Sequence, residues 1–308
     1  MSPADGIPRA LGWRCAVCAA SVDIADAFPW RCPNATTTDR RHLLQLLIAP
    51  GAPAAGPGGN PFVEHDPDLA WAAYAAANGM TGAARRALVD ELDRAVAGVA
   101  GVGFHRTPVA RSPELSDELG FSTRGGVWVK DETGGVAGSQ KARHLFTILL
   151  HLRAAELLGH LRERPPLAIA SCGNAALAAA TLAKAADWPI DVYVPTWMSD
   201  GFGRRLDELG ATTHRCERRP DDPPGDPAML RFRDAVDRGA IPFTVQGPEN
   251  ALCLDGGRTI GWELCEQLGE AGAGPLDRIF VQVGGGAFAA CLGSAFQQAC
   301  GPVPVHAV

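Results

Sequence analysis

The sequence predicts an α/β fold built around a parallel sheet. From Val127 onward, short apolar stretches alternate with helical patterns of ten or more residues, which is typical of βαβ units. The expected strands are 127–130, 167–171, 190–194, 211–216, 241–245, 278–283 and 303–308. With 308 residues, of which 46% are hydrophobic and 20% charged, the chain is long enough for about two globular domains.

Composition and charge exclude two classes of partner. The chain has 28 Lys and Arg residues against 34 Asp and Glu residues, a formal net charge of -6, and no basic block of the kind that binds nucleic acid. No apolar run reaches the roughly 18 residues of a membrane span, and residues 1–6 lack the charged segment that begins a signal peptide. We therefore expect a cytoplasmic protein that binds neither nucleic acid nor membrane.

The cysteines indicate free thiols. There are nine, an odd number, and they are scattered, which favours a reducing compartment over a disulfide framework. Three of them, Cys15, Cys18 and Cys32, resemble three quarters of a zinc ribbon. The second knuckle lacks its other cysteine because Asn34 follows Pro33, and His42 is the available substitute. These three cysteines are the candidate metal ligands, although we favour a metal-free segment over bound zinc.

The chain divides into four predicted parts. The Pro- and Gly-rich stretch 49–61 predicts a linker or surface loop. Residues 66–98 carry helical patterning, and 104–109 reads as an extended segment. The predicted parts are a Cys-containing extension and linker (1–60), a helical segment (61–126), an α/β domain (127–240) and part of a second α/β domain (241–308).

The first candidate loop contains Lys141. A glycine-rich loop leads from the strand at 127–130 into a helix expected at 141–160, and Ser139 stands at the N-cap position. Lys141 then falls in the first helical turn, where the helix dipole and partial burial both lower the pKa of an amine. Such a lysine suits Schiff-base chemistry. The alternative is a surface lysine on an amphipathic helix.

The second candidate loop is Ser171, Cys172, Gly173 and Asn174, between a strand and an Ala-rich helix. Its hydroxyl, amide and helix N–H groups suit an anion such as a carboxylate, with one further hydrogen bond to a ring oxygen. The alternative is a plain βα turn with Asn174 as N-cap. Cys172 as a nucleophile is less favoured, because such a thiol needs a base within hydrogen-bond reach.

The third candidate loop is Gly284, Gly285, Gly286 and Ala287, which follows a strand and opens a helix at 288–299. Glycines allow close approach of a phosphate, and the helix N-terminus supplies N–H donors. A dinucleotide site would need an acidic residue about 20 positions on, and 303–308 has none. A P-loop would end in Lys-Ser or Lys-Thr, which is also missing. The loop therefore favours a cofactor monophosphate.

A lysine, an asparagine loop and a glycine loop in this order resemble the fold-type II pyridoxal-phosphate-dependent enzymes, the group of tryptophan synthase β, cysteine synthase, threonine dehydratase and threonine synthase. The segments that carry the resemblance are 106–108, 130–132, 138–143, 171–174, 257–263 and 283–286. The N-terminal cysteines are similar to the ribbon ahead of some threonine synthases, which favours a threonine synthase-like member.

The resemblance implies two three-layer parallel-sheet domains of the tryptophan synthase β-like type, a homodimer, and a C-terminal part that lies beyond this chain. Lys141 would hold pyridoxal 5′-phosphate as a Schiff base and act as acid and base at the substrate α-carbon. Asn174 would bind the cofactor 3′-oxygen, and Ser171 to Asn174 the substrate carboxylate. Gly284 to Ala287 would hold the phosphate.

The implied function is a lyase or synthase that catalyses β- or γ-elimination or replacement on a small amino acid. Gln140 stands where many members have an aromatic residue, and His144 stands where threonine synthases and dehydratases usually have glycine, so the substrate stays open. No residue is assigned to the pyridine nitrogen. The alternative is a catalytically silent cofactor-binding relative with a regulatory or interaction role.

Overall fold

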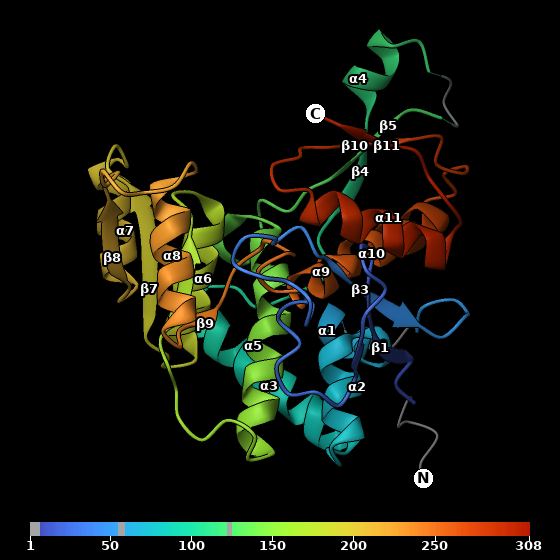
Figure 1. Ribbon diagram of the computed structural model, residues 1–308. Helices are drawn as coiled ribbons and strands as arrows, with labels where there is room; N and C mark the ends of the chain where they lie inside the picture. The colour runs from blue at the N-terminus through green and yellow to red at the C-terminus, as the bar shows by residue number, and fades with distance from the viewer. Residues whose placement is uncertain (1–6, 55–58, 122–124) are drawn as a thin grey trace.

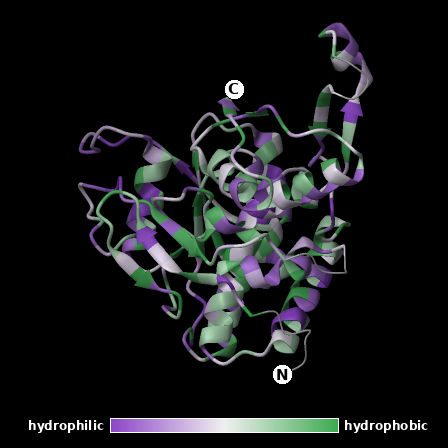
Figure 2. Cartoon of the chain, turned by 90° about the vertical axis from the view of Figure 1, so that its right-hand side faces the viewer, coloured by the Kyte–Doolittle hydropathy of each residue, from purple (hydrophilic) through white to green (hydrophobic). Residues whose placement is uncertain are grey.

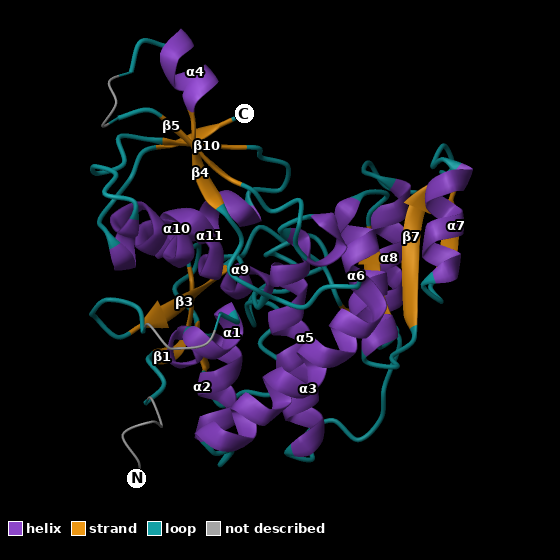
Figure 3. Ribbon diagram, turned by 180° about the vertical axis from the view of Figure 1, so that it is seen from behind, coloured by secondary structure: helices purple, strands orange, loops and turns teal. Residues whose placement is uncertain are grey.

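A computed structural model describes residues 7–54, 59–121 and 125–308. Residues 1–6, and 55–58 of the predicted linker, therefore lie outside the described residues. A helical body surrounds the long helix α5 (Lys141–Leu157), with the main sheet on one side of it and a small N-terminal sheet on the other (Figures 1 and 3). Within the described ranges, no helix combines the length and the apolar character that a membrane crossing requires.

The main sheet has four parallel strands in the order β8-β7-β6-β9. Its strands are β6 (Leu167–Ala170), β7 (Ile190–Pro195), β8 (Thr212–Cys216) and β9 (Ile241–Pro242). The connecting helices are α6 (Asn174–Ala185), α7 (Asp200–Glu208) and α8 (Pro227–Asp237). The predicted α/β class with a parallel sheet is confirmed.

Alternation along these strands produces three layers. Ile169 and Val192 pack into the main core together with residues of α6 and α7, whereas Ala168 and Tyr193 pack against Phe232 of α8. Successive side chains of a strand point to opposite faces, so each strand serves both layers. The carboxyl end of β6 delivers the chain to residues 171–174 at the start of α6.

Four of the predicted strands have partners that the sequence did not predict. Strand β9 pairs with β6, a strand of the predicted segment 127–240. Strand β5 (Val127–Lys130) pairs antiparallel with β4 (Val109–Ser112), outside the parallel sheet. Strands β10 (Ile279–Val281) and β11 (Val305–Ala307) form a separate parallel pair. A short apolar run predicts a strand but leaves its partner undetermined.

The N-terminal extension forms an antiparallel sheet, β2-β1-β3, which was not predicted. Its strands are β1 (Ala10–Cys15), β2 (Ser21–Asp23) and β3 (Leu44–Ile48). The predicted helical stretch 66–98 divides into α2 (Ala70–Ala77) and α3 (Gly82–Ala100), because Thr81 caps α3 by accepting a hydrogen bond from the Ala84 N–H. Two short helices complete this half, α1 (Pro61–Glu64) and α4 (Pro113–Glu118).

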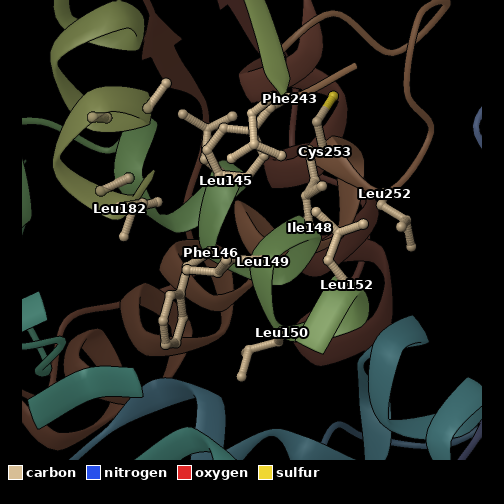
Figure 4. Packing of buried hydrophobic residues seen from close by; sticks show 14 of the residues in the cluster. Leu145, Phe146, Ile148, Leu149, Leu150, Leu152, Leu182, Phe243, Leu252 and Cys253 are labelled. Carbon is tan, nitrogen blue, oxygen red and sulfur yellow. The ribbon is translucent and has the colours of Figure 1, made fainter. Parts of the chain in front are cut away.

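Helix α5 is buried along most of its length, and 13 of its 17 residues are buried. It packs against α2, α3 and α6 and against the short helix α9 (Cys253–Gly256) (Figure 4). A helix that is apolar on most sides belongs in a core.

The chain continues through α10 (Arg258–Glu270) and α11 (Ala287–Ala299). Hydrophobic residues gather in the interior, whereas the projecting α4 is largely hydrophilic (Figure 2).

A glycine fixes the distance between α9 and α5. A Cβ atom added at Gly256 would overlap the carbonyl oxygen of Arg143. We expect Gly256→Ala to lower the free energy of unfolding by about 1–3 kcal/mol, since the two backbones would have to separate. Gly293→Ala in α11 is the matched control, because no heavy atom lies within 4 Å of its added Cβ, and it should be neutral or stabilising. Urea unfolding of both variants checks this, and equal effects would contradict it.

Candidate active site

Lys141 is the first residue of α5, within the first turn as expected. Gln140 is the N-cap, one residue later than predicted, and the Ser139 hydroxyl still accepts a hydrogen bond from the Lys141 N–H at 3.4 Å. Burial lowers the pKa of Lys141. Among the described residues, Nζ of Lys141 makes no hydrogen bond or ion pair. The site therefore offers an unpaired amine that loses its proton more readily than an exposed lysine does.

The chain has three lysines, Lys130, Lys141 and Lys184. Nζ of Lys130 donates to Glu263 at 2.6 Å and to the Thr107 carbonyl at 2.8 Å. Nζ of Lys184 donates to the Glu208 carbonyl at 2.7 Å. Of the three, Lys141 is the one whose amine is left available, which disfavours the alternative of an ordinary surface lysine.

The titratable residues that interact with Lys141 from the buried side, His144, Cys253 and Cys291, are neutral near pH 7. Buried His144 donates from Nδ1 to the Cys253 carbonyl at 2.7 Å, and burial lowers its pKa to about 4. Cys253 and Cys291, the groups whose charges act on Lys141, are both buried, and burial raises the pKa of Cys291 to about 12. At neutral pH both thiols therefore keep their protons, and neither supplies a negative charge to a protonated Lys141. These two cysteines could not be predicted as neighbours of Lys141, because they lie more than 100 residues from it in the sequence.

The loop at 171–174 lies at the carboxyl end of β6. Asn174 is the first residue of α6, and Gly173 is the N-cap, so Asn174 does not cap the helix. Within the described residues the Asn174 side chain makes no hydrogen bond, and it is exposed. Ser171 Oγ accepts from the Gly173 N–H at 3.3 Å. No histidine in the described part of the chain hydrogen-bonds Cys172, so a nucleophilic role for this thiol gains no support.

The glycine loop opens α11. Gly286 is the N-cap with a left-handed φ of 83°, and no side chain caps the first turn. A Cβ added at Gly284, Gly285 or Gly286 would meet no heavy atom within 4 Å. The glycines thus leave open space beside the start of α11, and buried Ala287 anchors the helix. These features fit a phosphate group.

The three loops border one hydrophobic core. Ala142, Ala175 and Ala287, each at one of the loops, belong to the same cluster of buried residues. Helix α5 packs against α6 and α9, and α9 packs against α11. Among the described residues no hydrogen bond joins one loop directly to another. The helices that carry the three loops therefore pack around a shared core. The polar groups of one loop are not hydrogen-bonded to those of another and stay available.

A buried ion pair holds the start of α5. Arg143 donates from Nη1 to Glu263 Oε1 at 2.5 Å and from Nη2 to Oε2 at 3.1 Å. Lys130 adds its bond to the same carboxylate, and Arg143 Nε lies 3.2 Å from Glu132. Burial opposes ionisation of Glu263, but the two cations outweigh it and lower its pKa. Segments 130–132, 138–143 and 257–263, predicted only as motif pieces, meet here.

Sequence reasoning named these pieces without predicting that they pair. Glu263 follows Trp262 and precedes Leu264, and all three are buried. A charged residue inside an apolar helix face demands a partner of opposite charge, which was the available signal. The sequence alone did not determine which of the 28 Lys and Arg residues would be the partner of Glu263.

The structure also places a hollow away from these loops. A cavity of about 640 Å³ lies over β7, β8 and α8. Its lining residues are Tyr193, His214, Arg215, Cys216, Glu217, Arg218, Arg219, Pro220, Arg231, Asp234 and Arg238. None of the candidate residues lines it, so we assign it no part in the site.

The candidate metal ligands Cys15, Cys18 and Cys32 also lie together, and His42 joins them.

Comparison with known families decides the assignment. The profile of the family described as "Pyridoxal-phosphate dependent enzyme" matches residues 102–308, about two thirds of the chain. The chain belongs to this family. The predicted membership and its cofactor, pyridoxal 5′-phosphate, are thereby confirmed, and the open glycine loop and the unpaired Lys141 fit that cofactor. A search of curated proteins found no match.

Solved structures show the same fold. The chain is similar to a diaminopropionate ammonia lyase from Escherichia coli (21% identity, TM-score 0.56, covering 72% of this chain and 62% of that one). It is also similar to an L-serine ammonia-lyase from Rhizomucor miehei (25%, 0.52, 66% and 58%) and to an aspartate racemase (23%, 0.56, 71% and 62%). The chain thus spans about three fifths of the length of these relatives.

Removing the charge of Glu263 should be costly. Glu263→Gln leaves Arg143 and Lys130 buried without their anion, so we expect the free energy of unfolding to fall by about 3–5 kcal/mol. The control is Arg205→Gln, which breaks the exposed pair of Arg205 and Glu208 and should cost less than about 1 kcal/mol. Urea unfolding at pH 7 compares them, and similar losses would contradict a special role for the buried pair.

The same pair predicts a pH dependence. The pKa of Glu263 is lower in the folded than in the unfolded chain, where a glutamate titrates near about 4.3. Its contribution to stability is therefore present above that value and is lost as the pH falls through the folded-state pKa. Unfolding free energies measured from pH 6 to pH 3 should fall more steeply for the wild type than for Glu263→Gln. Parallel curves would contradict this.

Proposed function

We propose that this chain forms the active site of a pyridoxal-phosphate-dependent lyase or synthase that performs β- or γ-elimination or replacement on a small amino acid. The observation that carries the proposal is the half-buried amine of Lys141, which makes no hydrogen bond or ion pair among the described residues. The uncapped glycine loop at the start of α11 supports it. Similar structures named as a diaminopropionate ammonia lyase and an L-serine ammonia-lyase support the elimination chemistry.

Three groups of residues would hold the cofactor. Lys141 Nζ would bind its aldehyde carbon, the N–H groups at Gly284 to Ala287 its phosphate, and the Asn174 amide its ring oxygen. When bound, the cofactor supplies an electron sink for negative charge at the substrate α-carbon. The exposed, unbonded side chain of Asn174 is available for such a bond without breaking another one.

The chain's own residues would bind the substrate and move its proton. The Ser171 hydroxyl and the N–H groups of Cys172, Gly173 and Asn174 would orient the substrate carboxylate at the start of α6. Nζ of Lys141 would take the α-proton and return a proton to the leaving group. Because burial lowers the pKa of this amine, a larger fraction of it is neutral near pH 7 than for an exposed lysine.

We also propose a domain layout. The segment 127–240 together with β9 would form one α/β unit around the four-stranded sheet, and the remainder of 241–308 would belong to a second unit. The site would lie between the two, since Lys141 and Asn174 come from the first and the glycine loop from the second. A homodimer of such chains follows from the resemblance stated above.

Lys141 should be required for the spectrum of the bound cofactor. Wild-type protein mixed with pyridoxal 5′-phosphate should develop a visible absorption band that is retained after gel filtration. Lys141→Ala should lack the band, since neither Lys130 nor Lys184 has an available amine. Lys184→Ala is the matched control and should keep it. A band of full intensity in Lys141→Ala would contradict the assignment.

The substrate class follows from α-proton exchange. The holoprotein is incubated in D₂O with serine, threonine, O-phosphoserine, homoserine phosphate and 2,3-diaminopropionate, and exchange and product release are monitored by NMR. Exchange with loss of a β- or γ-substituent supports the proposal. A protein that shows the band and exchanges none of these protons is instead the catalytically silent relative.

A negative charge in the glycine loop should weaken cofactor binding. Gly285 has no left-handed φ and has open space at its Cβ, so the fold should tolerate Gly285→Asp. Like charges about 4 Å apart near a protein surface repel by several kcal/mol. We therefore expect at least a roughly tenfold rise in the Kd for pyridoxal 5′-phosphate. Gly285→Ala, which adds volume without charge, should change it little, and equal Kd values for the two variants would contradict a phosphate site here.

A further inference from the structure

Four potential metal ligands converge in the N-terminal extension. The ligand atoms of Cys15, Cys18, Cys32 and His42 all lie within 4.8 Å of one another. Cys15 Sγ lies 3.5 Å from His42 Nδ1, and Cys18 Sγ lies 3.5 Å from Cys32 Sγ. In a tetrahedral zinc site, with Zn–S near 2.3 Å and Zn–N near 2.0 Å, neighbouring ligand atoms are about 3.5–3.8 Å apart. Both short separations match that geometry.

The local fold brings these residues together from three segments. Cys15 ends β1, Cys18 lies in the turn between β1 and β2, and His42 lies two residues before the start of β3. The pairing of Cys15 with Leu44 places the β3 side of the sheet beside the first cysteine. Ala19, with a left-handed φ of 61°, closes the turn by donating its N–H to the Cys15 carbonyl. The sheet therefore preforms the cluster.

The surroundings of the cluster orient the ligands. The N–H of Val17 donates to Cys15 Sγ, the N–H of Asn34 to Cys32 Sγ and the Asn34 side-chain amide to Cys18 Sγ, each at 3.4 Å. Asp39 Oδ2 lies 3.8 Å from His42 Nε2, the ring nitrogen that faces away from the cysteines. N–H donors to sulfur and a carboxylate behind a histidine are typical outer contacts of a metal site.

The segment between Cys18 and His42 covers the body of the enzyme. Its carbonyls accept hydrogen bonds from the body, Ala27 from His151 Nε2 of α5 at 2.6 Å and Trp30 from the Ala251 N–H at 2.9 Å. Arg31 and Arg40 both pair with buried Glu249. Glu249 and Ala251 lie just before α9, the helix beneath Lys141. An interaction that holds the segment between Cys18 and His42 in place therefore also supports the residues just before α9, which packs against α5.

We propose that Cys15, Cys18, Cys32 and His42 bind one structural zinc ion. Three thiols and an imidazole select zinc over the oxygen-preferring cations. Four protein ligands leave no position for a reacting water, so the ion closes the ring of chain between Cys15 and His42 and holds the covering segment against α5. The proposal is independent of the cofactor and of the reaction.

Metal analysis of the purified full chain tests the site. Elemental analysis should find one zinc ion per chain in wild-type protein purified without chelator. Cys18→Ser should reduce the content to near zero, and because Cys18 is exposed the far-UV circular dichroism should persist. His42→Ala should also lose zinc, whereas His42→Cys, which restores four ligands, should retain it. Cys300→Ser, at an exposed cysteine elsewhere, is the matched control and should keep one zinc.

Cobalt gives a second measurement that does not depend on the stability of the variants. Chelated wild-type protein reloaded with Co²⁺ under reducing conditions should show thiolate charge-transfer bands and the d–d bands of four-coordinate cobalt. Removal of zinc should speed hydrogen exchange in residues 25–31. Wild-type protein that takes up neither metal, variants that keep full zinc content, or a Cys18–Cys32 disulfide in the protein as purified would each overturn the proposal.

Discussion

The ion pair between Arg143 and Glu263 fixes the position on which the candidate site depends. It joins the first turn of α5 to the middle of α10, and both side chains are almost completely buried. Removing either partner would leave the other buried with one remaining partner, Glu132 for Arg143 and Lys130 for Glu263, so separating the two helices is costly. Lys141 lies two residues before Arg143. Its place in the fold is therefore set by an interaction in which it takes no part.

The distribution of charged partners around this ion pair also bears on the lowered pKa of Lys141. The other two lysines are occupied by a carboxylate and a carbonyl, and the carboxylate of Glu263 is shared between Arg143 and Lys130. Beneath Lys141 the structure places the neutral His144 and two buried thiols. Burial is therefore the largest influence on Lys141 and lowers its pKa.

Close backbone contacts complete the frame. Gly256 allows α9 to reach the carbonyl of Arg143, and a Cβ at Gly257 would overlap the ring of His144. His144 takes the place where the resemblance leads one to expect glycine, and glycine on the facing segment leaves room for its ring. A large residue on α5 is thus matched by a small one on the facing segment, which keeps the packing dense.

Local patterns predicted much of this architecture. The strands of the main sheet, the helices that follow them and the three candidate loops were predicted from alternation, glycine and capping signals. The partners of β5, β9 and β10 were not, because strand pairing depends on contacts between distant segments. The pairing of Arg143 with Glu263 was missed for the same reason, whereas His42 had been named as the available fourth partner of the cysteines. In both clusters the residue types indicated that partners were needed, and the three-dimensional fold determined which residues serve as those partners.

The central claim is that Lys141 is the residue that binds the cofactor covalently. Holoprotein is reduced with borohydride, digested with a protease that tolerates a modified lysine, and mapped by mass spectrometry. The account predicts a stoichiometric pyridoxyl adduct on the peptide that carries Lys141, and unmodified peptides for Lys130 and Lys184. An adduct on either of those lysines, or none after reduction of protein saturated with pyridoxal 5′-phosphate, would contradict it.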